Sequence, residues 1–184
     1  MGKFKLSIFC LALLSGGLTT CSAYAAASPG GIINFTGNII TAGCKTDMDG
    51  THTKDVPMDT VDVSNFTGQT AGPKGFDIVL TECAEGTQVK GYFSASTAVV
   101  NSSGRLENAS TDSAPSNVTL QLLDANNSDA VIDVGSSAQK ADGYTTIPAS
   151  KGATLSYIVQ YYNEAGTVTA GPVESNVLYS LDYK

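Results

Sequence analysis

Cys44 and Cys83 are the residues of this chain whose chemistry is easiest to predict. They are the two cysteines that remain once Cys10 and Cys21 are removed with the N-terminal leader described below. Two cysteines in an exported chain most simply oxidise to one disulfide, with two separate buried thiols as the alternative. The loop that the bond would close is long, so in the chain-entropy account it stabilises the fold by about 4 kcal/mol.

The side chains offer little else for catalysis or metal binding. His52 is the single histidine and lies in a polar stretch, whereas a general base needs an oriented partner. No Ser-His-Asp order or Cys-His pair can be built once the disulfide forms. Residues 47–50, Asp-Met-Asp-Gly, resemble the start of a calcium loop but lack its later ligands and closing Glu. We therefore expect no enzymatic activity, no metal site and no cofactor.

Three tyrosines, Tyr157, Tyr161 and Tyr162, could line a sugar-binding site. Alternating tyrosines in a strand more often pack in the core or against a neighbouring strand. We favour packing, and keep a carbohydrate-binding module as an alternative function.

The first 25 residues predict a secretory signal peptide. Lys3 and Lys5 precede an apolar run over residues 6–14, and Ala23-Tyr24-Ala25 fits the small-x-small cleavage rule. The apolar run is too short to span a bilayer, which needs about 20 residues. The sequence before Cys21 resembles a lipoprotein box, but Thr20 departs from it. A lipid-anchored protein is therefore only an alternative.

Charge and composition narrow the class of protein. Removal of the two leader lysines changes the formal net charge from −7 to −9, which argues against nucleic acid or anionic membranes as partners. Only 15% of residues are charged, Trp is absent, and Gly, Ser, Thr and Asn are abundant. This composition favours an all-β domain with many turns.

Alternation of apolar and polar residues is the dominant pattern along the chain. It predicts strands at residues 31–40, 75–83, 87–95, 117–124, 130–133, 153–163 and 173–183. Gly-containing turn signals separate them, and no helical period is sustained. Seven or eight strands predict a β-sandwich with Greek-key links. The polar stretch 45–70 predicts a long loop with a short strand near 55–63.

A well-patterned strand is expected near each end of the mature chain, at 31–40 and 173–183. A strand at the rim of a sheet exposes unpaired N–H and C=O groups, which proteins normally protect. Two such strands, one near each end of the chain, indicate that they serve to pair with another chain.

These motifs, taken in order, resemble a known family. "GGIINFTGNIITAGC", "GFDIVLTEC", Gly171 and the penultimate Tyr183 resemble the chaperone–usher pilins, specifically the type 1 fimbrial (major) subunits of Gram-negative bacteria. Ser175 departs from the pattern, because an apolar residue there would give a cleaner alternation.

The resemblance implies an incomplete immunoglobulin-like Greek-key sandwich that lacks its last strand, plus an N-terminal donor-strand extension. It implies a signal peptide at 1–25, a donor extension at 26–40 and a pilin domain at 41–184. The implied donor residues are Gly31, Ile33, Phe35 and Gly37. The implied acceptor-strand and chaperone-recognition residues are Gly171, Val173, Val177, Tyr179, Leu181, Tyr183 and Lys184.

The function implied is that of a structural subunit of a surface fimbrium. It would fold with a periplasmic chaperone, pass an outer-membrane usher and polymerise head-to-tail with identical neighbours by donor-strand exchange, with a tip adhesin or adaptor as a further possible partner. Its length favours a major shaft subunit over a tip adhesin, and a usable donor sequence argues against a terminator. The alternatives are a minor adaptor or terminator pilin, and a secreted or lipid-anchored carbohydrate-binding β-sandwich.

Overall fold

The computed structural model describes residues 43–184, apart from 49, 51–52 and 96–99. The chain divides into two units, Met1–Gly37 and Asn38–Lys184, and all described residues belong to the second. The expected signal peptide, the donor extension 26–40 with Gly31, Ile33, Phe35 and Gly37, and also His52, lie outside the described residues.

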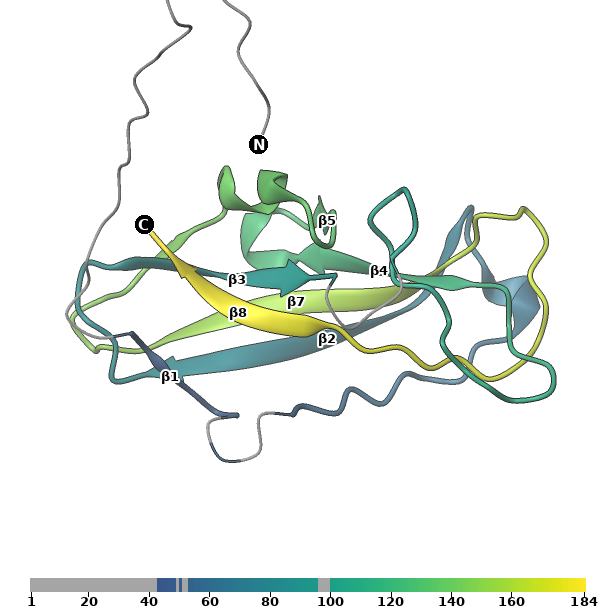
Figure 1. The fold of residues 1–184 in the computed structure, drawn as a ribbon, viewed down its shortest axis with the longest axis horizontal. Helices are drawn as coiled ribbons and strands as arrows, with labels where there is room; N and C mark the ends of the chain where they lie inside the picture. Colours follow the sequence, from purple (N-terminus) through teal and green to yellow (C-terminus); the bar gives the residue numbers. More distant parts are fainter. Residues whose placement is uncertain (1–42, 49, 51–52, 96–99) are drawn as a thin grey trace, which may run out of the picture. The chain divides into compact units, whose positions relative to one another are not determined.

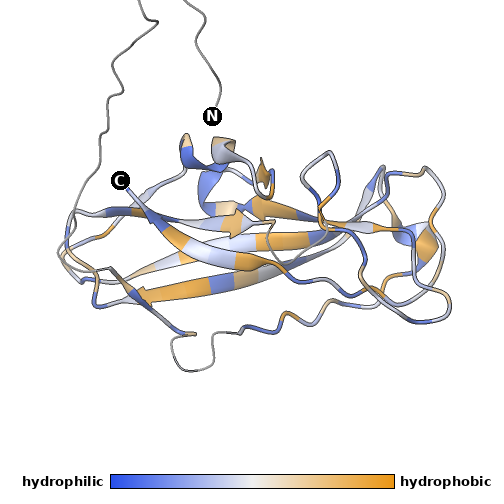
Figure 2. Ribbon diagram, viewed as in Figure 1, coloured by the Kyte–Doolittle hydropathy of each residue, from blue (hydrophilic) through white to orange (hydrophobic). Residues whose placement is uncertain are grey.

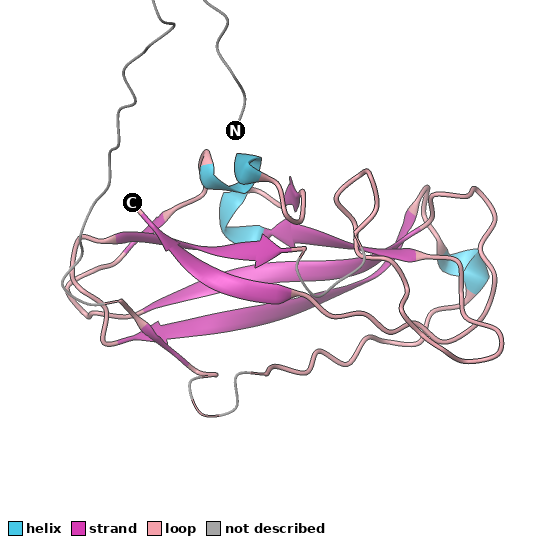
Figure 3. Ribbon diagram, in the orientation of Figure 1, coloured by secondary structure: helices cyan, strands magenta, loops and turns pink. Residues whose placement is uncertain are grey.

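The described residues form two antiparallel sheets (Figures 1 and 3). The five-stranded sheet has the order β1 (Lys45–Thr46), β2 (Thr70–Thr81), β7 (Ala153–Tyr162), β4 (Thr119–Asp124) and β5 (Ala130–Ile132). The three-stranded sheet has the order β6 (Thr145–Thr146), β3 (Gln88–Ser94) and β8 (Leu178–Tyr183). Three short 3₁₀ helices, η1 (Val63–Asn65), η2 (Ala125–Asn127) and η3 (Ser137–Lys140), connect the strands. The predicted all-β sandwich is confirmed.

The core lies between the sheets and is built by the predicted alternation. Ile78 of β2 is paired with Leu155 of β7, and both side chains are 2% exposed. Figure 2 shows apolar segments along β2 and β7. Phe93 of β3 meets Tyr157 of β7 edge-on, with ring centroids 4.9 Å apart, and so joins the two sheets.

The disulfide between Cys44 and Cys83 is confirmed, with an S–S distance of 2.05 Å. It ties the start of β1 to the chain just after β2. Since the two residues are 39 apart in sequence, the bond constrains a long loop of the unfolded chain.

Two sequence predictions differ from the structure. No strand forms at 55–63, and the described residues of this stretch run without ladder pairs, although Val56 and Met58 pack against the core. Residues 173–177, expected as strand, precede the ladder of β8. Strands β1 and β6 have two residues each, which is too short for a periodic signal, and the sequence did not predict them.

The three tyrosines have separate roles. Tyr157 is 2% exposed, and its hydroxyl accepts the Gly91 N–H at 2.9 Å, so the packing interpretation is confirmed for it. Tyr161 packs against the core and donates its hydroxyl to Asp59 O. Tyr162 faces the opposite side, where the Arg105 guanidinium lies 3.6 Å from its ring centre.

Candidate strand-binding groove

Strand β8 lies at the edge of the three-stranded sheet (Figure 1). It pairs with β3 from Ser94↔Leu178 to Val89↔Tyr183. Within the described part of the chain, its other edge has no ladder partner. An edge of this kind presents a row of backbone donors and acceptors to any strand that arrives.

The opposite edge of the same sheet is covered. Strand β6 pairs with the first residues of β3. Further along, the Gln139 amide accepts the Phe93 N–H at 3.0 Å and donates to Phe93 O at 2.9 Å, as a neighbouring strand would. The contrast singles out β8 as the open edge of this sheet.

The inward-facing side chains of the C-terminal segment are only half covered. From Val173 to Leu181, half-buried and exposed residues alternate strictly. The inward row is Val173, Ser175, Val177, Tyr179, Leu181 and Tyr183. On the paired strand β3, Val89 and Phe93 are 0% and 2% exposed. The apolar members of the inward row therefore pack on the core yet lack a cover on one side.

Two tyrosine hydroxyls span the groove near β1. The Tyr183 hydroxyl accepts the Cys44 N–H at 2.9 Å, and the Tyr179 hydroxyl donates to Thr46 Oγ1 at 3.2 Å. Since the disulfide holds Cys44 to the end of β2, these bonds connect β8 to the five-stranded sheet. This end of the groove is closed.

The other end opens into a cavity of about 550 Å³. Residues 58–63 form one side of it, residues 168–173 the other, and Phe66, Ser116, Val118 and Tyr161 complete it. Apolar residues make up more than half of the lining, which also includes Asp59, Asp62 and Ser116.

The start of the acceptor segment is anchored to the loop at 108–117. A Cβ on Gly171 would lie 2.2 Å from Ala114 O, so no larger residue fits. The Asn108 side chain donates to Pro172 O at 2.9 Å and accepts the Glu174 N–H at 3.0 Å. The sequence pattern did not indicate Asn108, because its partners here lie more than 60 residues further along the chain.

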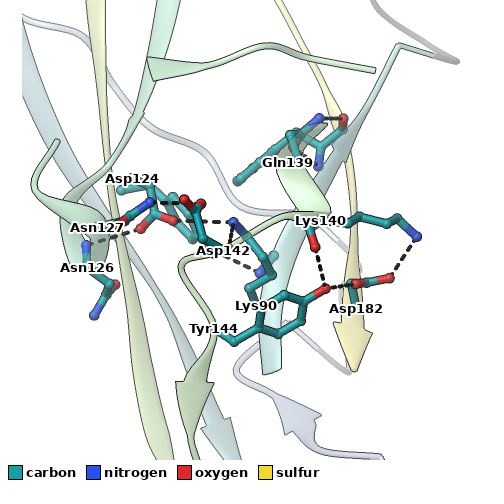
Figure 4. Close-up of polar contacts among 12 residues, drawn as sticks. Lys90, Asp124, Asn126, Asn127, Gln139, Lys140, Asp142, Tyr144 and Asp182 are labelled. Atoms are coloured by element: carbon teal, nitrogen blue, oxygen red, sulfur yellow. Dashed lines mark hydrogen bonds and ion pairs between the residues drawn. The ribbon is translucent and has the colours of Figure 1, made fainter. Parts of the chain in front are cut away.

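A polar cluster on the outer face holds the end of β8 (Figure 4). Asp182 pairs with Lys140 Nζ at 2.7 Å and accepts the Tyr144 hydroxyl. Burial alone would raise the pKa of Asp182, but the hydrogen bonds from Lys140 and Tyr144 outweigh it and lower that pKa. Burial and the same carboxylate raise the pKa of Tyr144 to about 12, so its hydroxyl remains a donor. Nothing in the sequence pattern indicated this cluster.

A buried ion pair links the two sheets in the same region (Figure 4). Lys90 Nζ of β3 lies 3.7 Å from Asp124 Oδ2 of β4 and donates to Asp142 O at 2.8 Å. Burial raises the pKa of Asp124 despite the opposing charge of Lys90. Loss of one partner from a buried pair is costly, so we regard this pair as structural.

Within the described residues, no cluster of His, Cys, Asp and Glu could hold a metal ion, and no helix is long and apolar enough to cross a membrane. In the calcium-like motif, Asp47 accepts the Val79 N–H and pairs with Lys54. A sandwich open along one edge strand, with a half-covered apolar row beneath it, is an arrangement to which another strand can be added.

Comparisons with known proteins agree. The model of the family described as "Type-1 fimbrial protein, A" matches residues 58–184. The major fimbrial subunit SMF-1 of Stenotrophomonas maltophilia is 33% identical over 163 residues, which cover 86% of this chain and 95% of that protein. The chain therefore belongs to the type-1 fimbrial protein family, whose members are structural subunits of surface fimbriae.

Solved structures show the same fold. The Burkholderia pseudomallei antigen and type I fimbria protein BPSL1626 superposes with a TM-score of 0.51 at 28% identity, over 82% of this chain and 96% of that one. The P pilus rod subunit PapA superposes with a TM-score of 0.56 at 19% identity, over 78% of this chain and all of that one. The predicted immunoglobulin-like pilin fold is confirmed.

Proposed function

We propose that this fimbrial subunit is a shaft subunit that polymerises by donor-strand exchange. The observation that carries the proposal is the half-covered inward row of residues 173–183 beside the open edge of β8. An added strand would pair with the free backbone groups and cover the row with alternate side chains. In this account the sandwich is completed by the neighbouring subunit.

Residues 26–40 of the next subunit are the proposed donor. Gly31, Ile33, Phe35 and Gly37 fall on one face of this sequence, and the apolar residues among them match an apolar groove. The glycines permit close approach of the two backbones.

The two ends of the groove support a head-to-tail arrangement. The extension of a subunit leaves its own domain at Gly43, whose Cβ position is 3.0 Å from the Tyr183 hydroxyl. The open cavity lies at the other end of the row, beside Val173. A donor subunit whose extension enters at that end would lie beyond Val173. Its own groove would then point the same way along the row of subunits. A heterologous contact that does not close produces a filament.

The exposed edge also explains the partners that we propose before assembly. An apolar row beside an unpaired edge is prone to aggregation, so a periplasmic chaperone would fill the same groove first. The carboxylate of Lys184 would anchor that chaperone, and an outer-membrane usher would receive the complex. The signal peptide at 1–25 and the disulfide fit export through the oxidising periplasm. At the fibre's end, a tip adhesin or adaptor subunit would use the same contact.

Deletion of residues 26–37 tests the donor role. The variant should form a chaperone complex but no fibres, as judged by electron microscopy and by size-exclusion chromatography of the surface fraction. Alanine at Asn34 and Thr36, which lie on the other face of the proposed donor, is the matched control and should leave fibres intact. Fibres of normal length from the deletion variant would refute donor-strand exchange.

A further inference from the structure

We propose that residues 133–140, here called the guard segment, close the part of β3 that β6 leaves uncovered, with the Gln139 amide in place of a strand. Without the guard segment, a second copy of this chain would be able to pair with β3 from the side. This inference concerns the edge of the sheet opposite to β8 and does not depend on donor-strand exchange.

Strand β3 is longer than the strand beside it. β6 pairs only with Gln88 and Val89, so Gly91 and Phe93 lie past its end. Gln88 O accepts the Lys184 N–H on the side of β8. Since successive residues of a strand direct their backbone groups to opposite edges, Gly91 and Phe93 direct theirs away from β8. These groups need a partner that is not a strand.

The Gln139 side chain supplies both partners for Phe93. Its Oε1 atom accepts the Phe93 N–H at 3.0 Å, and its Nε2 atom donates to Phe93 O at 2.9 Å. One amide thus makes the two bonds that a residue of an antiparallel strand would make. The Gly135 N–H also donates to Phe93 O at 2.9 Å. Gln139 is 8% exposed, so water has little access to these bonds.

The Gly91 N–H has its partner on the other sheet. The Tyr157 hydroxyl of β7 accepts it at 2.9 Å. A Cβ at residue 91 would lie 2.6 Å from that oxygen, so glycine lets the hydroxyl reach the backbone. With Gly91 and Phe93 both satisfied, this edge offers no free N–H at either residue to an arriving strand.

Contacts across the outer face of the sheet hold the guard segment in place. Lys140 Nζ lies 4.8 Å from the centre of the Tyr92 ring and pairs with Asp182 of β8 at 2.7 Å (Figure 4). The Tyr92 hydroxyl donates to Gly135 O at 3.2 Å. The guard segment is therefore attached to β3 and to β8.

An amide protects this edge in a way that an apolar side chain does not. An apolar residue at 139 would cover Phe93 but leave its N–H and C=O groups without partners, which is costly. A strand from a second chain would satisfy both groups, so the bare edge would favour association. Gln139 removes this driving force. β8 then remains the long open edge of this sheet within the described residues.

Residue-resolved amide exchange of the mature chain tests the guard role. Gln139→Met keeps the length of the side chain but removes its donor and acceptor. In dilute subunits the Phe93 amide should exchange at least about tenfold faster in this variant than in wild type. The Gly91 amide, held by Tyr157, should change little and is an internal control.

The dependence on concentration separates a guard from a merely structural residue. In concentrated Gln139→Met, the Phe93 amide should regain protection, because a second copy covers it, and electron microscopy should show assemblies joined side by side. Wild type should protect Phe93 at every concentration.

Leu155→Val is the matched control, since it removes buried volume from β7, a strand that is paired on both edges. It should lower stability without side-by-side association. If Gln139→Met does not fold, Gln139→Glu takes its place with the same expectation, because an ionised carboxylate cannot donate to Phe93 O.

Side-by-side association of Leu155→Val to the same extent would assign the effect to lost stability and overturn the proposal. Faster exchange of Phe93 without association at any concentration would make Gln139 a structural residue only, which also overturns it. Wild-type chain that forms no fibres would contradict donor-strand exchange, yet association of the variant at β3 would still support the guard.

Discussion

At the scale of single residues, the structure gives a physical reason for Gly171, one residue of the family signature. The resemblance assigned it to the acceptor segment, and the structure adds that its missing side chain lets the chain pass against the loop at 114–116. The cysteine pairing was predictable because only two thiols remain once the expected signal peptide is removed. The bonds of Asn108 and Asp182 were not, since each depends on loops that fold far from it in sequence.

Replacement of Gly171 by Ala should destabilise the domain by about 1–3 kcal/mol, because its Cβ would collide with backbone atoms that cannot move freely. Urea unfolding of the mature subunit measures this. Gly75→Ala is the matched control, since a Cβ there comes no closer than 3.9 Å to its nearest neighbour. Equal unfolding free energies for the two variants would mean that the packing of Gly171 is unimportant.

At the scale of elements, β8 is held on one edge by β3 and at its end by the cluster of Lys140, Tyr144 and Asp182. Long strands with regular alternation, such as β2 and β7, were predictable from sequence. The two-residue strands and the irregular course of 53–62 were not, because tertiary contacts rather than periodicity define them.

The cluster should make the attachment of β8 sensitive to acid. The pKa of Asp182 lies below 3.8 in the folded domain, so the carboxylate stabilises the fold above pH 3.8 and loses this effect as pH falls through the lowered pKa. Asp182→Asn should therefore be less stable than wild type at neutral pH, and the difference should shrink with acidification. The pKa values of Lys140 and Tyr144, which hydrogen-bond to Asp182, are raised, so both groups stay protonated throughout this range.

Urea unfolding at a series of pH values checks this. Asp77→Asn, at an exposed position on β2, is the matched control for the removal of one carboxylate. A stability gap for Asp182→Asn that persists unchanged below pH 3.8 would contradict the assigned role of the carboxylate.

At the scale of the whole molecule, the described residues form a sandwich in which β8 lacks a ladder partner on one edge, and we propose that the fibre forms because each subunit supplies that partner to the next. The open edge was predictable from the strong strand pattern at the C-terminus. The closed and open ends of the groove were not, because they arise from Tyr179, Tyr183 and the cavity at residues 168–173. Because the two ends of the groove differ, strand exchange would add subunits head-to-tail and produce a linear polymer.

Amide hydrogen exchange of β8 tests the central claim most directly. Mass spectrometry would compare the peptide covering 178–183 in monomers lacking residues 26–37 with the same peptide in fibres of the mature chain. The account predicts exchange at least about tenfold slower in fibres, because a new strand satisfies the free edge. β7, already paired on both sides by β2 and β4, should change little. Equal exchange of residues 178–183 in monomers and fibres would contradict the account.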